Sequence, residues 1–139
     1  MEPSSVSSQD RAALIDAIRS ELERRQEIRW AYLHGSFLEA GPYRDIDVAL
    51  WVEPTPGHPP EWRRYELDLS VALYLATRQP VEVRVLNDAP LAFRYHALKG
   101  QPLLVRDWER LDEVRARTWD DYFDFLPFAR QYLREALSA

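Results

Sequence analysis

The chain has 139 residues, of which 46% are hydrophobic and 29% charged, and its formal net charge at neutral pH is -5. These values are typical of one globular domain with an ordinary core. The negative charge argues against direct nucleic-acid binding, because there is no basic surplus to neutralise phosphates. The absence of cysteine excludes disulfides, thiol catalysis and zinc ribbons. We expect a cytoplasmic protein without membrane contact, since no apolar run approaches the roughly 18 residues of a membrane span.

The N-terminal part is expected to hold a short tail and a first helix. Residues 1–7 are Ser-rich and predict a flexible tail, and residues 8–137 are expected to form a single domain. Ser8 can cap a helix that runs to about residue 25. Its apolar positions recur at helical spacing: Leu14, Ile15, Ile18 and Leu22.

Two strands should follow, separated by a tight turn. Residues 28–33 are rich in β-forming side chains and lead into Gly35-Ser36. Residues 46–52 are almost continuously apolar, which predicts a strand buried on both faces at its far end. The Pro-rich segment 54–60 can be neither helix nor central strand, so it is predicted to be a surface loop.

The second half of the chain alternates helix and strand patterns. An apolar stripe predicts a helix over residues 61–78, stopped by Pro80. Residues 81–86 predict a third strand with Val81, Val83 and Val85 on one face and Glu82 and Arg84 on the other.

The C-terminal third predicts two more helices around a short edge strand. Asn87-Asp88 can cap a short helix with Pro90 in its first turn, ending at Lys99-Gly100. Residues 103–105 should be an edge strand, and a long helix should run from a cap at Asp107 to Leu137, with a kink or break at Pro127. The order of elements favours an α+β fold: a small antiparallel or mixed sheet with helices on one side.

The turn and the second strand carry the residues with the clearest chemistry. Gly35 permits a tight bend and close approach of a ligand, and Ser36 offers a hydroxyl and a backbone N–H for a phosphate oxygen. Asp45 and Asp47 are two residues apart, so on a strand their carboxylates project from the same face. Paired carboxylates suit Mg2+, which prefers oxygen ligands and binds together with phosphates. The alternative is that both aspartates are only the solvated edge of a strand.

Gly35-Ser36 followed by Asp45-Ile46-Asp47 resembles the active-site signature of the DNA polymerase beta-like nucleotidyltransferases. The chain is most similar to their small prokaryotic branch, the minimal nucleotidyltransferase (MNT) proteins, from about Trp30 through the C-terminal helix. The resemblance implies the nucleotidyltransferase fold and a reaction in which two Mg2+ ions assist transfer of AMP from ATP to a hydroxyl. It also implies a partner, because MNT proteins act as antitoxins that AMPylate a tyrosine of a HEPN-domain RNase toxin, so a hetero-oligomer is expected.

The resemblance assigns the metal ligands to Asp45, Asp47 and Glu82, where Glu82 takes the place of the third acid, more often Asp in the family. Glu82 could instead be a solvated residue paired with Arg84. Gly35, Ser36 and Arg44 are the candidate nucleotide-binding residues. Arg44 is included because the family's usual Arg in the turn is missing, with Leu38-Glu39-Ala40 in its place.

Two other functions remain open at this point. The missing turn arginine and the glutamate in third place favour an antitoxin that neutralises its toxin by binding alone. A small-molecule nucleotidyltransferase, such as one that modifies aminoglycosides, is the second alternative, although such enzymes usually carry an additional acceptor domain. His34, His58 and His96 share no metal-ligand spacing, and none is assigned a role.

The long C-terminal helix is unusually rich in aromatic residues. Most of them are expected to pack on the sheet, since aromatic stripes at helical spacing are usually core. The helix has more aromatic residues than one of its faces can hold, so an exposed patch for a partner is also expected. The aromatic residues are Trp108, Trp119, Tyr122, Phe123, Phe125, Phe128 and Tyr132.

Overall fold

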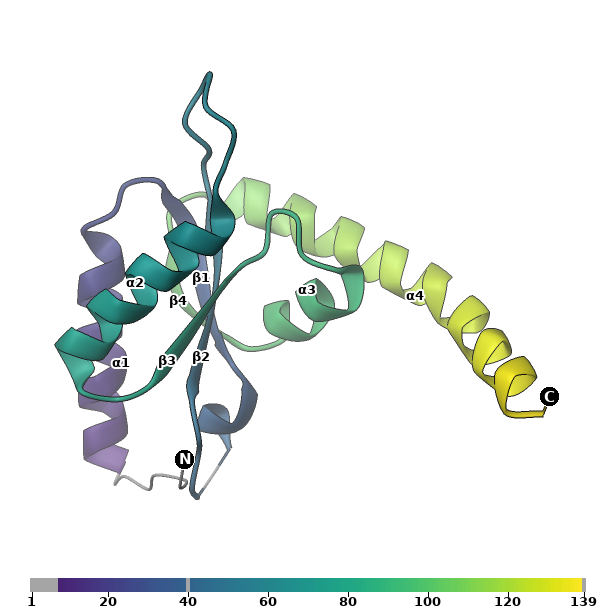
Figure 1. Ribbon diagram of the computed structural model, residues 1–139, viewed down its shortest axis with the longest axis horizontal. Coiled ribbons are helices and arrows are strands. Elements are labelled where there is room, and N and C mark those ends of the chain that lie inside the picture. Colours follow the sequence, from purple (N-terminus) through teal and green to yellow (C-terminus); the bar gives the residue numbers. More distant parts are fainter. Residues whose placement is uncertain (1–7, 40, 139) are drawn as a thin grey trace.

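The computed structural model describes residues 8–39 and 41–138 (Figure 1). The tail expected at residues 1–7 lies outside the described residues. Within them, strands β1 (Ile28–His34), β2 (Ile46–Val52), β3 (Val81–Val85) and β4 (Gln101–Val105) form one sheet in the order β3-β2-β1-β4. β1 is antiparallel to both β2 and β4, whereas β2 and β3 are parallel. The sheet is therefore mixed, and the α+β class is confirmed.

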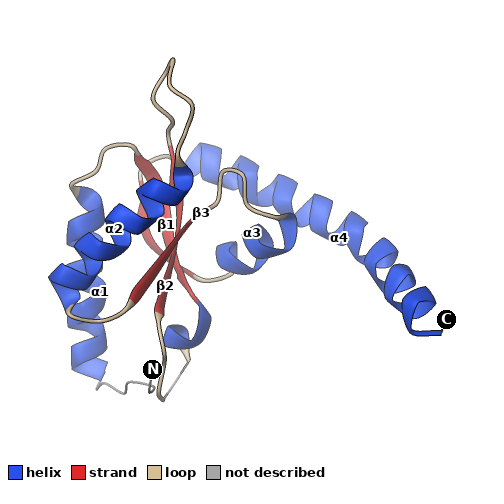
Figure 2. Ribbon diagram, in the orientation of Figure 1, coloured by secondary structure: helices blue, strands red, loops and turns tan. Residues whose placement is uncertain are grey.

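Helices cover both faces of this sheet, so the expectation of helices on one side is wrong (Figure 2). One face packs against α1 (Ser8–Glu23) and α2 (Trp62–Thr77), and the other against α3 (Leu91–Leu98) and the beginning of α4 (Trp108–Ser138). The second cover is needed because Trp30, Tyr32 and Ala49 form a second apolar face, which would otherwise remain in water.

The first face, against α1 and α2, is the larger core cluster. Val48 and Leu50 of β2 have no exposed surface, and neither has Leu73 of α2. Side chains alternate along a strand, so Val81, Val83 and Val85 point to this face while Glu82 and Arg84 point to the other, as predicted.

Helix α2 also protects the outer edge of β3. The backbone N–H of Val85 donates to Oε2 of Glu66 at 2.8 Å, and that of Val83 donates to Oγ of Ser70 at 3.3 Å. An edge strand exposes unpaired N–H groups that invite pairing with another chain. Two polar side chains of α2 therefore close this edge, and this explains why Glu66 is only 9% exposed.

Several element ends differ from the predictions. Asn87 does not cap a helix: its side chain donates to the carbonyl of Val52 and accepts from the N–H of Val52, which ties the loop after β3 to the end of β2. Helix α3 consequently begins at Leu91, after Pro90, and the edge strand begins at Gln101 rather than Leu103.

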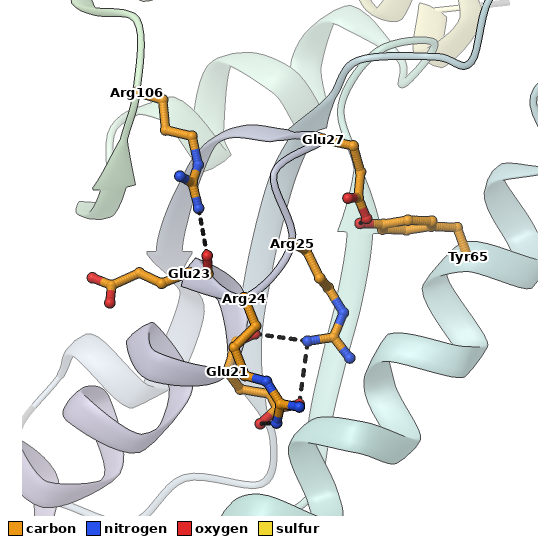
Figure 3. A network of polar contacts seen from close by, with 7 residues as sticks. All are labelled: Glu21, Glu23, Arg24, Arg25, Glu27, Tyr65 and Arg106. Atoms are coloured by element: carbon orange, nitrogen blue, oxygen red, sulfur yellow. Dashed lines mark hydrogen bonds and ion pairs between the residues drawn. The ribbon is translucent and has the colours of Figure 1, made fainter.

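At the end of the sheet where β1 begins, polar contacts join α1, α2 and β4 (Figure 3). Arg25 donates to the carbonyl of Glu21 at 2.7 Å, and Arg106 donates to that of Glu23 at 2.8 Å, so two arginines satisfy carbonyls in the last turn of α1. The hydroxyl of Tyr65 donates to Glu27 at 2.7 Å. Burial, with this hydrogen bond second, raises the pKa of Tyr65 above its usual value.

Helix α4 is the longest element and only its first part packs on the sheet. Asp107 caps it, as predicted, by accepting from the N–H of Arg110 at 3.0 Å. The helix continues through Pro127 without the expected break, and its second half projects away from the body (Figure 1). Across residues 8–39 and 41–138, neither this helix nor any other has the length and apolar character required to cross a membrane.

Candidate active site

The bend between β1 and β2 begins at Gly35, whose φ is +80°, in the region that favours glycine. A methyl group at this position would overlap Oδ2 of Asp47, so the Asp47 carboxylate lies directly against the Gly35 backbone. Gly35 is thus required for two reasons, its backbone conformation and the space that Asp47 occupies. Ser36 follows in the short 3-10 helix η1 (Gly35–Leu38) and is exposed.

Strand register places three polar residues in one row across the sheet. His34 of β1 is opposite Asp47 of β2, and Asp47 is opposite Glu82 of β3. All three lie on the face that α3 and α4 cover only in part, because they alternate with residues of the first core cluster. Asp47 is half-buried in this row, and Glu82 is exposed.

Asp45 lies just before β2, which begins at Ile46. It lines a pocket together with Glu82 and with Arg63, Glu66 and Ser70 of α2, beside the edge of β3. Asp45 and Glu82, the other two acids of the predicted triad, therefore share one pocket.

The three carboxylates interact electrostatically. The pKa of Asp47 is raised from 3.8 to about 6, first because burial disfavours its charge, then because of repulsion from Glu82 and from Asp45. Such repulsion is what a bound cation would relieve, so the donor set suits a hard divalent ion. In the part of the chain that the structure describes, however, no three His, Asp or Glu side chains form a group arranged to hold a metal ion. The acids are close but do not converge as they stand.

Basic and aromatic groups border this row. The guanidinium of Arg84 lies 4.5 Å from the ring centroid of Phe93, and its Nε is 3.9 Å from Oε2 of Glu66. His34 packs edge-on against Phe93 at 5.5 Å. Burial first, and the positive charge of Arg84 second, lower the pKa of His34 below its usual value. Arg44, predicted to bind the nucleotide, is exposed on the loop before Asp45.

The loop that carries the bend is anchored from α1, which sequence reasoning missed. Arg11 donates to the carbonyl of Phe37 and, at 2.7 Å, to that of Gly41. Its guanidinium also lies 4.8 Å from the Phe37 ring, which packs edge-on against Tyr43 at 4.8 Å. No local signal could have revealed this contact, since Arg11 is separated from Phe37 by an entire strand.

The fold is that of a nucleotidyltransferase. Residues 16–109 match the sequence profile of the family described as "Polymerase beta, Nucleotidyltransferase". The match spans more than half of the chain, and the chain therefore belongs to the polymerase beta nucleotidyltransferase family. No curated protein matches the chain significantly.

Several solved structures share the fold. One is a tri-AMPylated HEPN toxin in complex with an MNT antitoxin from Shewanella oneidensis, with a TM-score of 0.65 and 19% identity over 94% of this chain and 98% of that chain. A second is the toxin-antitoxin MntA-HepT, with a TM-score of 0.65 and 17% identity over 96% and 100%. A third is a toxin-antitoxin with AMP-PNP, with a TM-score of 0.70 and 21% identity over 90% and 98%. At these identities the similarity establishes the fold.

Proposed function

We propose that the protein transfers AMP from ATP to a hydroxyl group, with Asp45, Asp47 and Glu82 as the catalytic carboxylates. The observation that carries this proposal is that Asp47 lies against Gly35 and opposite Glu82, where burial first, and repulsion from Glu82 and Asp45 second, raise its pKa to about 6. Strongly perturbed acids in a cleft are typical of functional sites. Membership of the family and the AMP-PNP bound in a similar structure support the choice of an ATP-like donor.

Asp45, Asp47 and Glu82 are the residues that would hold Mg2+, of which two ions are expected. The bound ions would supply charge neutralisation for the triphosphate. A small rotation of side chains would be needed to bring the acids together, because they are coupled but not convergent. Gly35 and Ser36 would contact the phosphates, with Arg44 adding a positive charge from the adjoining loop.

The transfer itself needs positioning and one proton acceptor. The oxygen of the acceptor hydroxyl attacks the α-phosphorus of ATP, a new O–P bond forms, and the bond to the β-phosphate oxygen breaks to release pyrophosphate. The hydroxyl proton passes to a carboxylate, and Glu82 is suited to this role because it is exposed at the edge of the site.

The decisive variant is the double substitution Asp45→Asn with Asp47→Asn. We expect loss of AMP transfer from radiolabelled ATP to the acceptor protein, while Asp68→Asn, an exposed aspartate on α2, serves as the matched control. Unchanged transfer by the double variant would rule the mechanism out.

We infer that the acceptor is a tyrosine of a HEPN-domain toxin, so that the protein acts as an antitoxin. Two similar structures are complexes of this kind, and one of their toxins is AMPylated. The second half of α4 provides a surface for such a partner. Most of the aromatic residues expected to pack on the sheet are instead exposed there: Phe123, Phe125, Phe128 and Tyr132, at 54%, 48%, 72% and 72%. Exposed aromatic side chains on one projecting helix are typical of a surface that binds a partner.

The partner assignment can be tested by co-expressing this chain with a HEPN-domain toxin. The variant Phe128→Ser with Tyr132→Ser should lose co-purification, whereas Val71→Ser, which removes an exposed apolar residue from α2, should retain it. Equal co-purification of both variants would place the interface elsewhere.

One observation favours the alternative, an antitoxin that only binds its toxin. Among residues 8–39 and 41–138, no three acidic or histidine side chains are arranged to hold a metal ion. Calorimetry separates the two functions: a transferase should bind ATP in the presence of Mg2+, and a binding-only antitoxin should show no metal-dependent heat. The small-molecule transferase remains a third possibility, which a test of aminoglycoside resistance in cells would decide.

A further inference from the structure

A second site lies on the α3 and α4 face of the sheet, away from the carboxylates. Eight residues line a pocket there, and we call it the arginine pocket: Trp51, Arg94, Arg110, Glu113, Val114, Ala116, Arg117 and Thr118. They come from β2, α3 and α4, so three elements enclose it. Trp51 is four residues beyond Asp47 on the same strand, which corresponds to about 13 Å. The pocket is therefore distinct from the site proposed for nucleotidyl transfer.

The indole of Trp51 forms a rigid wall of this pocket. Its ring stacks on that of Trp30, with centroids 5.1 Å apart and planes at 19°. The guanidinium carbons of Arg94 and Arg110 lie 5.8 Å and 5.9 Å from its centroid. The interaction of one cation with the face of an aromatic ring is favourable, and here two arginines lie near the same ring. The Trp51 ring thus lies close to two positive charges.

The pocket is positively charged, whereas the chain as a whole is negatively charged. Three arginines and one glutamate line it, in a protein whose net charge is -5. Glu53 offsets one arginine, since its Oε2 is 2.8 Å from Arg110. Arg94 donates through Nη2 to the carbonyl of Asn87 at 3.0 Å, which orients its guanidinium without neutralising it. With both glutamates counted, the pocket keeps one positive charge in excess.

Two hydrogen-bond donors of the lining residues are left without an acceptor. Among the described residues, neither Nε1 of Trp51 nor Nε of Arg94 has a hydrogen-bond partner, although both atoms are buried. A buried donor left unpaired costs about 1–3 kcal/mol, and such groups call for an explanation. Both atoms belong to residues that line this cationic pocket, and an anion that reached them would supply the acceptors they lack.

We propose that the arginine pocket binds a phosphate group. Donors reach it from three elements, a strand and two helices, and this suits a tetrahedral anion with oxygens in several directions better than a planar carboxylate with two. Guanidinium groups also match phosphate geometry through paired N–H donors. The phosphate can come from free phosphate or pyrophosphate, or from a nucleotide. This inference is independent of the proposed transferase activity.

The test uses the indole N–H signals of the full chain in proton–nitrogen correlation spectra. The five tryptophans of the chain provide five probes, and Trp51→Phe assigns the one of interest. Inorganic phosphate is titrated at constant ionic strength. We expect a saturable shift of the Trp51 signal, and a loss of affinity of about tenfold or more in Arg117→Gln. Arg117 is exposed, so this variant should fold normally. Arg134→Gln, the same change on the projecting part of α4, should bind as the original chain does.

The result that would overturn the proposal is a Trp51 signal that does not move with phosphate, or that moves equally in Arg117→Gln. Acetate in place of phosphate provides a second check, because equal binding would show that the pocket does not select phosphate and would overturn the proposal. Pyrophosphate and AMP, titrated in the same way, distinguish the sources: tighter binding of AMP than of phosphate would identify a nucleotide, and the reverse a free anion.

Discussion

The helices bury the two faces of the sheet to different degrees. On the first face, α1 and α2 close over aliphatic residues such as Val48 and Leu50, which have no exposed surface. On the second face, α3 and α4 cover Trp30 and Tyr32 but leave the row of His34, Asp47 and Glu82 at the margin of the cover. The same strand β2 contributes to both faces, through alternate residues.

This difference separates the residues that stabilise the fold from those that carry charge. The first face has the greater apolar burial, which is the main favourable contribution to folding. The second holds a carboxylate whose charge is disfavoured where it lies, and perturbed groups of this kind are generally retained for function rather than for stability. Truncation of a buried aliphatic residue on the first face should therefore lower stability, whereas neutralisation of Asp47 on the second face should raise it.

The largest effect is expected on the first face. Leu50→Ala removes a fully buried side chain and should lower the free energy of unfolding by about 2–5 kcal/mol. Urea denaturation measures the change. Leu137→Ala, at a residue that is 85% exposed, is the control and should stay within about 0.5 kcal/mol. Similar losses from both variants would mean that the first face is not the principal core.

Gly35→Ala should have the next largest effect, because it combines an unfavourable φ with overlap of Asp47. We expect a loss of about 2–3 kcal/mol together with loss of AMP transfer. Gly57→Ala separates the two causes: its φ is +81° but an added methyl group would meet nothing within 4 Å. That control should lose about 1–2 kcal/mol and keep its activity. If Gly57→Ala costs as much as Gly35→Ala, contact with Asp47 contributes nothing.

Asp47→Asn should act in the opposite direction and raise stability at neutral pH. The pKa of Asp47 is raised from 3.8 to about 6, so the folded state holds this proton more tightly than the unfolded state. The resulting stabilisation is complete below pH 3.8 and is lost as the pH rises to about 6. The variant keeps a neutral side chain throughout, so it should be more stable than the original chain by about 1–2 kcal/mol above pH 6, with no advantage in acid.

Thermal denaturation as a function of pH measures this difference, with Asp68→Asn on exposed α2 as the matched control. An advantage of Asp47→Asn that is the same in acid as at neutral pH would show that the charge of the half-buried Asp47 is not its cause.

The smallest effect is expected from Mg2+. Binding to the acids should relieve their repulsion and stabilise the folded chain by about 1 kcal/mol at concentrations several times the dissociation constant. Melting temperatures in magnesium chloride and in sodium chloride of equal ionic strength provide the comparison. The double variant Asp45→Asn with Asp47→Asn should show no difference between the salts. A shift that persists in this variant would place the ion elsewhere.

Much of the fold could be predicted because it depends on local patterns. The alternation of Val81, Val83 and Val85 with Glu82 and Arg84 identifies a strand and its two faces, and the structure agrees. The cap at Asp107 was equally predictable, since capping needs only the next helical turn. Local sequence patterns gave a wrong prediction where a side chain hydrogen-bonds to a residue far away in the sequence. Asn87 resembles a cap, yet its amide is satisfied by Val52, 35 positions away.

The candidate site was predictable in part. Gly35 and Asp47 belong to one recognisable pattern, and the structure places them in contact. Glu82 is brought opposite Asp47 by strand register. The roles of these residues, and of Ser36, Arg44 and Asp45, remain predictions.

The sequence alone determined the order of helices and strands, the bend at Gly35 and the acidic residues beside it, because each depends on side chains a few positions apart. Only the tertiary structure decided that helices cover both faces of the sheet, that the aromatic half of α4 remains exposed, and that arginines from α3 and α4 meet at Trp51. These outcomes depend on which apolar surfaces can be buried together. Which surfaces are buried depends on how all the helices and strands pack together, so it cannot be read from any single segment.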